Sequence, residues 1–323
     1  MEDPGHSVRG QLWGTVLIGH PGFLTASAGG ARLSIKGARQ FDGDRLKLRA
    51  GQKVGCLVLR FAERYRVRVN GTVEAVRYTA PGQLDMQIAV EQAYDSCKKY
   101  VNVRHIELDE PRLDRMGSSA PPVWRASVGA GALGAAEQSL VQAADTFFIA
   151  SSSCPLAGEL TGMVGQRPAA VQPAAASLPA ATNSTQQQLQ HQQRQQQQRQ
   201  EQGALAFGCD ISLRGGMPGF VQVLERGAVL KWGDYPGNYM FNTGGNLLLQ
   251  PTAALLFLDF KTGDTLQVSG SADVLHGDMS LPGSKRAFVF RVHDYVHVTE
   301  ALPITTRDQV DYSPFNPGAL GAA

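Results

Sequence analysis

Short runs of apolar residues, separated by turn residues, recur along most of the chain. The run Tyr65–Val69 places Arg66 and Arg68 between apolar residues, which is the period of a β-strand with one face toward water. The run Leu255–Leu258 is apolar throughout and predicts a strand covered on both faces, as where a small barrel closes or meets a partner. The pattern therefore predicts a mostly β protein with antiparallel strands and short helices.

Five of these runs return in the same order in the second half of the chain. The pairs are Phe23–Ser27 with Phe147–Ser151, Leu33–Gly37 with Ile211–Gly215, Val54–Phe61 with Ala253–Phe260, Val67–Thr72 with Leu266–Ser271, and Met86–Val90 with Phe288–Val292. This recurrence predicts an internal duplication of a module with about six strands, which suits a small barrel. We expect a first module at residues 11–109, a Gly-, Ala- and Pro-rich linker at 110–140, and a second module at 141–317.

A long insert separates the first two matched runs of the second copy. It is rich in Ala and Pro over residues 168–181, and almost pure Gln with scattered Arg over 186–202. Such a segment has too few large apolar side chains to offset its ordering entropy, so residues 157–206 are predicted to be disordered. The alternative is that Arg194 and Arg199, within the Gln tract, bind RNA or a partner.

Composition limits the classes of ligand and the compartment. The net charge is +2, which provides no strong field for nucleic acid or acidic lipid, so neither nucleic acid nor a membrane is an expected partner. No signal peptide or membrane span is predicted, and we expect a cytoplasmic protein, with targeting to an organelle as an open alternative. The four cysteines are widely scattered, which indicates a reducing compartment.

The sequence contains no recognisable catalytic or metal-binding motif. There is no HExxH sequence, nucleophile elbow or P-loop, and no His or Asp constellation is indicated near Cys97. The histidines His276, His293 and His297 lie in the last predicted strands without metal-like spacing. We therefore assign no metal and no catalytic residue.

Two segments of the second copy have no counterpart in the first. The first is Arg214–Phe220, where Gly215 and Gly216 would let the backbone approach a ligand closely beside the guanidinium of Arg214. The second is Gly233–Thr252, in which Asn242 or Thr243 would cap a helix that runs to about Leu249. Backbone amides at the start of that helix, together with Arg214, would suit a phosphate monoester. The alternative is a Gly-rich surface loop with a structural helix cap and a salt-bridged arginine.

The end of the first copy carries its own distinctive element, Cys97–Arg104. Three cations, Lys98, Lys99 and Arg104, flank the ring of Tyr100. This edge could contact an anionic, stackable ligand that is held mainly by the second copy. A solvated, charged strand end is the alternative.

These motifs together resemble the pyridoxamine 5′-phosphate oxidase-like family of FMN-binding split barrels. The residues that carry the resemblance are Arg214-Gly215-Gly216, Pro218-Gly219-Phe220, Asp234-Tyr235, Gly237-Asn238, Asn242-Thr243, Asn246-Leu247, Pro251, Leu255-Leu256-Phe257 and Asp259-Phe260. The run Cys97–Tyr100 looks like the Cys-Pro-Lys-Tyr signature of the same group, with Lys98 in place of proline. The resemblance covers about residues 11–104 and 145–317.

The resemblance implies two tandem split barrels with FMN in the groove between them. By the same resemblance, the cofactor-binding residues would be Arg214, Gly215, Gly216, Tyr235, Asn238, Asn242, Thr243, Asn246, Lys99 and Tyr100. In the oxidases proper the helix start carries Arg and Lys where this chain has Asn242 and Thr243, which argues against pyridoxamine phosphate oxidase activity. Since most members of the family are homodimers, a chain with two modules could be a monomer with an internal pseudo-dimer, or a homodimer.

The expected function is that of an FMN-dependent oxidoreductase with an unknown small-molecule substrate or electron donor. In this class the flavin performs the electron chemistry and the protein positions it. One alternative is a flavin- or ligand-binding protein without turnover. Another is an interaction scaffold whose Gln-rich loop makes the contact.

Overall fold

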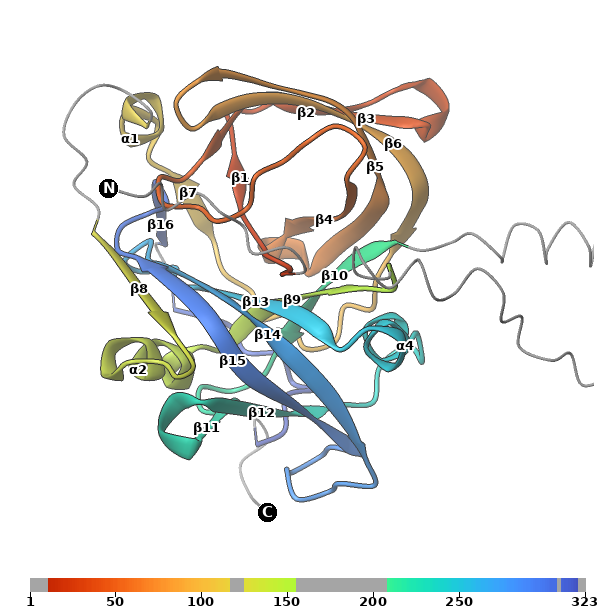
Figure 1. Ribbon diagram of the computed structural model, residues 1–323, viewed down its shortest axis with the longest axis vertical. Coiled ribbons are helices and arrows are strands. Elements are labelled where there is room, and N and C mark those ends of the chain that lie inside the picture. The colour runs from red at the N-terminus through yellow and green to blue at the C-terminus, as the bar shows by residue number, and fades with distance from the viewer. Residues whose placement is uncertain (1–10, 117–124, 155–207, 307–308, 319–323) are drawn as a thin grey trace, which may run out of the picture. The chain divides into compact units, whose positions relative to one another are not determined.

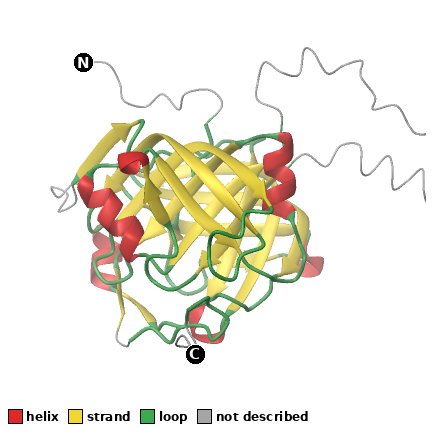
Figure 2. Cartoon of the chain, turned by 90° about the horizontal axis from the view of Figure 1, so that it is seen from below, coloured by secondary structure: helices red, strands yellow, loops and turns green. Residues whose placement is uncertain are grey.

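The computed structural model describes residues 11–116, 125–154, 208–306 and 309–318, which belong to one compact unit (Figure 1). The predicted insert at 157–206 lies outside the described residues. Strands dominate this unit, and its few helices lie at its periphery (Figure 2). The expected mostly β, antiparallel architecture is confirmed. Within the described part of the chain, every helix is too short or too polar to traverse a lipid bilayer.

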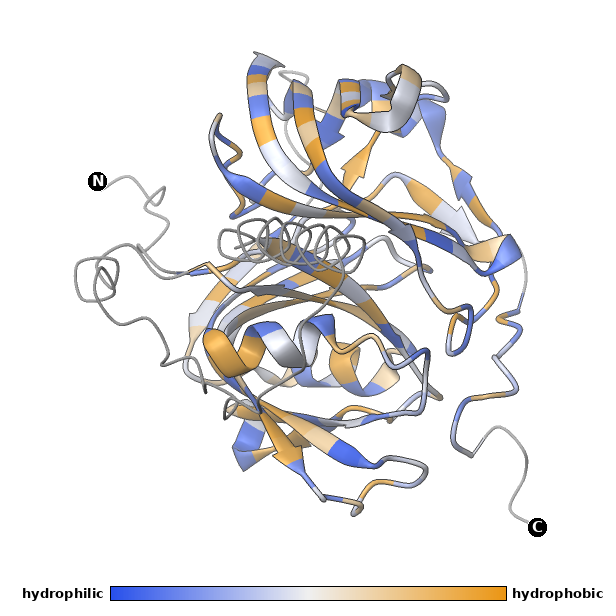
Figure 3. Ribbon diagram, turned by 90° about the vertical axis from the view of Figure 1, so that its right-hand side faces the viewer, coloured by the Kyte–Doolittle hydropathy of each residue, from blue (hydrophilic) through white to orange (hydrophobic). Residues whose placement is uncertain are grey.

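The first sheet contains six antiparallel strands. They are β1 (Leu17–Ile18), β2 (Leu24–Ala26), β3 (Arg32–Gln40), β4 (Lys53–Arg60), β5 (Tyr65–Ala80) and β6 (Gln83–Asp95). The order across the sheet is β1-β3-β6-β5-β4, and β2 pairs with the outer side of β3. Apolar and polar positions alternate along these strands (Figure 3), and the buried positions, among them Ile35, Leu84 and Ile88, form one core cluster.

The second sheet contains eight strands. They are β8 (Ala126–Ala130), β9 (Thr146–Ser152), β10 (Cys209–Gly215), β11 (Gln222–Leu224), β12 (Val229–Asp234), β13 (Thr252–Leu258), β14 (Thr265–His276) and β15 (Arg286–Val298). The order is β10-β9-β13-β14-β15-β12-β11, and β8 pairs with β15. An aromatic cluster fills its core, where the Phe147 ring lies 5.0 Å from both Trp232 and Phe257.

The remaining elements are short. They are β7 (Ile106–Leu108), which pairs with β16 (Ile304–Thr306), the helices α1 (Glu110–Arg115), α2 (Ala135–Ala143) and α4 (Asn242–Leu249), and the 3-10 turns η1 (Ala28–Gly30), η2 (Phe61–Glu63) and η4 (Glu225–Gly227). The segment predicted as a linker at 110–140 holds α1, β8 and the first part of α2. Because β8 pairs with β15, the second sheet already begins inside that segment.

The two sheets meet where β4 lies against β10. A Cβ atom on Gly55 would come within 2.7 Å of the Asp210 Cα atom, so this approach leaves no room for a side chain. One core cluster combines Val101 from the segment after β6 with Phe148, Leu213 and Leu256 from the second sheet. The sheets therefore share an apolar core around their line of contact.

Two of the five pairs of matched runs do not occupy equivalent positions in the two sheets. Strand β3 lies beside β6, the last strand of its sheet, whereas β10 lies at the edge of its sheet beside β9. The strand that lies beside β15 is β12. A short strand and a 3-10 turn precede β12, namely β11 and η4, just as β2 and η1 precede β3. Five-residue apolar runs look alike in any half-buried strand and carry no record of their pairing partner, so similarity alone misaligned these strands.

Candidate functional site

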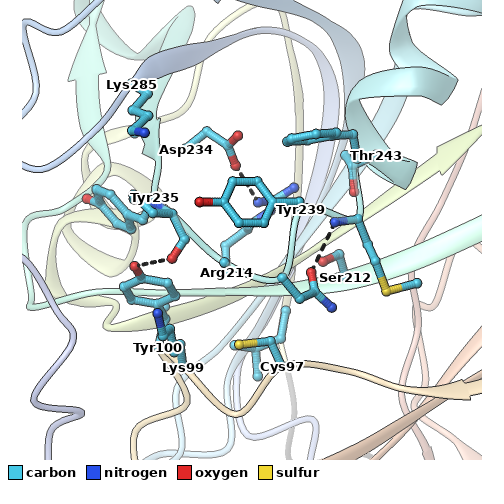
Figure 4. Close-up of a pocket in the computed structure, with 18 of the residues that line it drawn as sticks. Cys97, Lys99, Tyr100, Ser212, Arg214, Asp234, Tyr235, Tyr239, Thr243 and Lys285 are labelled. Atoms are coloured by element: carbon cyan, nitrogen blue, oxygen red, sulfur yellow. Dashed lines mark hydrogen bonds and ion pairs between the residues drawn. The ribbon is translucent and has the colours of Figure 1, made fainter.

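A pocket of about 290 Å³ lies where the first sheet meets the second (Figure 4). Its walls come from β5, from residues 97–100 after β6, from β10 and β12, and from the loop 235–241 that leads into α4. Residues far apart in sequence therefore face one cavity. Both halves of the chain contribute residues to the walls of this pocket.

Two arginines of β5 form the deep wall of the pocket. Arg66 and Arg68 are 7% and 9% exposed, because alternate residues of a strand share one face and this face lies against the second sheet. The prediction that this face contacts water is wrong. Arg68 is paired with a carboxylate: its guanidinium donates to Asp210 Oδ2 at 2.7 Å and to Ser212 Oγ at 2.8 Å.

Arg66 has no such carboxylate. Its Nη1 donates to the Leu213 carbonyl at 3.4 Å and its Nη2 donates to the Cys97 carbonyl. Its Nε atom is buried and has no hydrogen-bond partner among the described residues. Burial, reinforced by the nearby cations Arg68 and Arg214, lowers the pKa of Arg66 to about 10. Arg66 is therefore a buried cation that is compensated only by two carbonyl oxygens.

Arg214 of β10 shares one carboxylate with Arg286 of β15. Asp234 Oδ1 lies 3.0 Å from Arg214 Nη1, and Asp234 Oδ2 lies 2.6 Å from Arg286 Nε. Burial lowers the pKa of Arg214, although Asp234 opposes that effect. The predicted salt-bridged arginine is thus present, and one carboxylate neutralises only one of these two cations.

Two tyrosines form an aromatic wall on another side of the pocket. The rings of Tyr100 and Tyr235 lie 5.3 Å apart, and Tyr100 Oη donates to the Pro236 carbonyl at 2.8 Å (Figure 4). Burial raises the pKa of both phenols, that of Tyr235 to about 12. Tyr100 has a φ of 63° and Tyr239, also in the pocket wall, has 61°, a backbone strain that commonly accumulates at functional sites.

The glycine pair of the Arg214 motif serves the protein's own packing. A Cβ on Gly215 would lie 1.9 Å from the Tyr100 carbonyl oxygen, and one on Gly216 would lie 2.5 Å from the Phe220 ring. The missing side chains therefore make room for Tyr100 and Phe220, and the close approach of a ligand to these glycines stays a prediction. Gly215 brings β10 against the first module and so helps to place Tyr100.

Helix α4 begins at Asn242 and ends at Leu249, as expected, but its cap differs from the prediction. Phe241 occupies the cap position, and no side chain caps the helix. Asn242 Nδ2 instead donates to Tyr94 Oη at 2.5 Å, and Asn246 Nδ2 donates to Ser151 Oγ at 3.0 Å. Both amides are directed at protein groups, because Tyr94 and Ser151 present hydroxyls within reach.

The pocket gathers most of the predicted cofactor-binding residues. Those that line it are Arg214, Gly215, Tyr235, Asn238, Thr243, Lys99 and Tyr100, whereas Gly216, Asn242 and Asn246 do not. Residues of the pocket that the sequence did not single out for the site are Arg66, Arg68, Lys285 and Arg286, whereas Asp234 was named only within the resemblance. The alternation of apolar and polar residues placed Arg66 and Arg68 on one face of a strand. No sequence signal indicated that the second sheet covers that face.

Comparison of the chain with protein-family models, with curated proteins and with solved structures finds no match. Among the described residues there is also no group of His, Cys, Asp and Glu side chains that could hold a metal ion. The site must therefore be interpreted from its own chemistry. That chemistry is a cationic cavity with an aromatic wall, suited to an anionic ligand that carries a flat ring.

Proposed function

We propose that this protein binds FMN in the pocket between the two sheets and is an FMN-dependent oxidoreductase of unknown substrate. Arg66 carries the proposal, since a buried guanidinium without a carboxylate is costly unless a ligand supplies the missing negative charge. Buried Nε atoms without partners also occur on Arg68 and Arg214. The motifs that resemble the pyridoxamine 5′-phosphate oxidase-like family name FMN as a ligand of the required charge and shape.

The charge balance of the pocket supports a phosphate ligand. Six cationic side chains line it: Arg66, Arg68, Lys99, Arg214, Lys285 and Arg286. Two carboxylates pair with them, Asp210 with Arg68 and Asp234 with Arg214 and Arg286, which leaves four positive charges. A phosphate monoester carries about two negative charges near neutral pH, so it would neutralise half of this excess.

The side chains that line the pocket are of the types that would bind FMN. Arg66 would hold the phosphate together with the free donors of Arg214, because guanidinium groups bind phosphate oxygens through parallel hydrogen bonds. Tyr100 and Tyr235 would contact a flat ring, and the Thr243 hydroxyl supplies a further donor at the start of α4. FMN, when bound, supplies the one- and two-electron chemistry. The chain binds and orients it and keeps water from its phosphate.

We also propose that the two sheets are diverged copies of one split-barrel module. In both, three consecutive antiparallel strands pair in the same order, β4-β5-β6 and β13-β14-β15. Each last strand has a bulge at the same step, with Glu91 as the extra residue opposite the Asn70–Gly71 step and His293 opposite the Ser269–Gly270 step. A Cβ on either glycine would lie 2.0 Å from a carbonyl of the last strand. A shared bulge with the same steric requirement supports common descent, because bulges are retained within families.

The duplication would leave one cofactor site per chain. Leu59 of β4 and Leu258 of β13 are counterparts in the proposed duplication. Leu59 lies opposite Arg66 and Leu258 lies opposite Thr265, so Thr265 is the counterpart of Arg66. Two residues further along each strand, Gln267 is the counterpart of Arg68. Gln267 Nε2 donates to Asp44 Oδ1 at 2.7 Å and to the Gly14 carbonyl, so the second groove contains a neutral amide where the first has a cation. Without those cations it lacks the means to hold a phosphate.

A flavin-binding protein without turnover is the second candidate. The raised pKa values of Tyr100 and Tyr235 favour it, because phenols that remain protonated at neutral pH donate hydrogen bonds but cannot act as general bases. The absorbance spectrum of the purified protein tests flavin binding. Oxidation of NADH or NADPH by the flavin-loaded protein then separates the enzyme from the binding protein. Loss of FMN binding in Arg66→Met, but not in the exposed control Arg77→Met, is the expected result.

A further inference from the structure

Two of the four cysteines, Cys154 and Cys209, lie close together at one end of the second sheet. Cys154 lies two residues beyond the end of β9, Cys209 is the first residue of β10, and residues 155–208 lie between them in the chain. The two strands are antiparallel neighbours, with Cys209 directly opposite Ser152. Sequence spacing showed four scattered cysteines, whereas the sheet pairs two of them.

The Ser152 hydroxyl accepts hydrogen bonds from both cysteines. Ser152 Oγ accepts a hydrogen bond from the Cys154 backbone N–H at 3.0 Å and one from Cys209 Sγ at 3.5 Å. The chains remain paired just beyond, where the Ser153 N–H donates to the Gly208 carbonyl at 3.0 Å. Neighbouring strands held in this way keep two side chains near the separation that a disulfide requires.

The two thiols differ in their readiness to ionise. A hydrogen bond from Cys209 lowers the pKa of Cys154 to about 6, with smaller contributions from Ser152 and from the Lys53 ammonium, while Glu91 opposes them. The same hydrogen bond, together with burial, raises the pKa of Cys209. Both residues are partly accessible. A thiolate beside a protonated thiol is the arrangement of an attacking and a resolving cysteine.

We propose that Cys154 and Cys209 are a redox-active pair that forms a reversible disulfide by exchange with a low-molecular-weight disulfide such as glutathione disulfide. The Cys154 thiolate attacks one sulfur, and a mixed disulfide forms as one glutathione thiolate leaves. The Cys209 thiol, losing its proton to solvent, then attacks the Cys154 sulfur and releases the second glutathione. Two protein thiols are oxidised by two electrons, and one glutathione disulfide is reduced to two glutathiones.

This pair is separate from the flavin site. Neither Cys154 nor Cys209 lines the pocket, whereas Cys97 does. At pH 7 a thiol with a pKa of about 6 is about 90% thiolate, against about 1% at the ordinary value of 9.0. After allowance for the lower nucleophilicity of a less basic thiolate, Cys154 should react roughly fourfold faster than an ordinary thiol. The bridge would join the two ends of the segment 155–208.

The test is to treat the reduced full-length protein with glutathione disulfide, alkylate the remaining thiols, digest with trypsin without reduction, and identify cross-linked peptides by mass spectrometry. Cleavage after Arg and Lys separates all four cysteines, and the bridge joins peptide 126–194 to peptide 200–214. We expect this linked pair in the wild type and in the matched controls Cys56→Ser and Cys97→Ser. It should disappear in Cys154→Ser and in Cys209→Ser.

The Cys209→Ser variant also separates the attacking role of Cys154 from the resolving role of Cys209. In Cys209→Ser, Cys154 should retain one glutathione, since its resolving thiol is absent. Glutathione that stays on wild-type Cys154 without any linked peptide would overturn the proposal. An unmodified pair under conditions that oxidise dithiothreitol would overturn it as well.

Discussion

Replacing Arg66 with Met should stabilise the ligand-free protein and weaken flavin binding at the same time. Burial and neighbouring cations lower the pKa of Arg66 from 12.5 to about 10, which corresponds to a cost of about 3 kcal/mol for keeping the charge in this site. Methionine retains the apolar stem but leaves the Leu213 and Cys97 carbonyls without their donor, a loss of about 1 kcal/mol for each carbonyl. We therefore expect a net gain of about 1 kcal/mol in the free energy of unfolding.

Saturating FMN should reverse this order of stability. A ligand at a hundred times its dissociation constant adds about 2.7 kcal/mol to the wild type. Loss of a charge-assisted contact of about 1.5–3 kcal/mol lowers the affinity of Arg66→Met by roughly 10- to 150-fold. At the same FMN concentration the variant therefore gains only about 0.3–1.4 kcal/mol. The assay is urea unfolding with and without FMN, followed by fluorescence.

Arg68→Met is the matched control on the same strand. Its charge is already compensated by Asp210 at 2.7 Å, so its removal leaves a buried carboxylate and should cost the ligand-free protein about 3–5 kcal/mol. If Arg66→Met instead destabilises the ligand-free protein as Arg68→Met does, Arg66 is a structural residue and the reasoning fails.

Three further predictions concern the contact between the sheets and the cysteine pair. Gly55→Ala should lower the free energy of unfolding by about 1–3 kcal/mol, because the new Cβ meets the Asp210 backbone at 2.7 Å; an unchanged urea midpoint would show that β4 and β10 are not in close contact. Asp44→Asn should stabilise the protein at pH 7. Burial raises the pKa of Asp44 above 3.8, so the folded state loses stability as the pH rises from 3.8 through the raised pKa, and that decline should be absent from the pH profile of the variant. Alkylation of Cys154 by iodoacetamide should be half-maximal near pH 6, in line with a pKa of about 6; a midpoint near 9 would contradict the thiol hydrogen bond.

The sequence predicted the strands better than their partners. Alternating residues located β5, and an unbroken apolar run located β13, whose last six residues are buried. Pairing is a long-range property, and runs such as Phe23–Ser27 and Phe147–Ser151 are equally compatible with several neighbours. The similar runs therefore suggested a repeat, but they matched β2 and β3 with strands that occupy different positions in the second sheet.

The site was predictable only in part, for a related physical reason. Residues in distinctive local motifs, such as Arg214 and Tyr100, were identified and do line the pocket. Arg66 was missed, because its position in the pocket wall depends on a second module packing over a strand face that looks solvent-exposed. Asn242 was misassigned, since its hydrogen bond to Tyr94 joins residues 148 positions apart.

The central claim is that one FMN occupies the cationic pocket of each chain, and the direct test is the cofactor content of the purified protein. Protein is denatured after removal of free flavin, and the released cofactor is identified by mass spectrometry and quantified by absorbance. We predict FMN, close to one per chain after reconstitution, with strongly reduced occupancy in Arg66→Met. A colourless protein that takes up no added FMN, or full occupancy in Arg66→Met, would contradict the account.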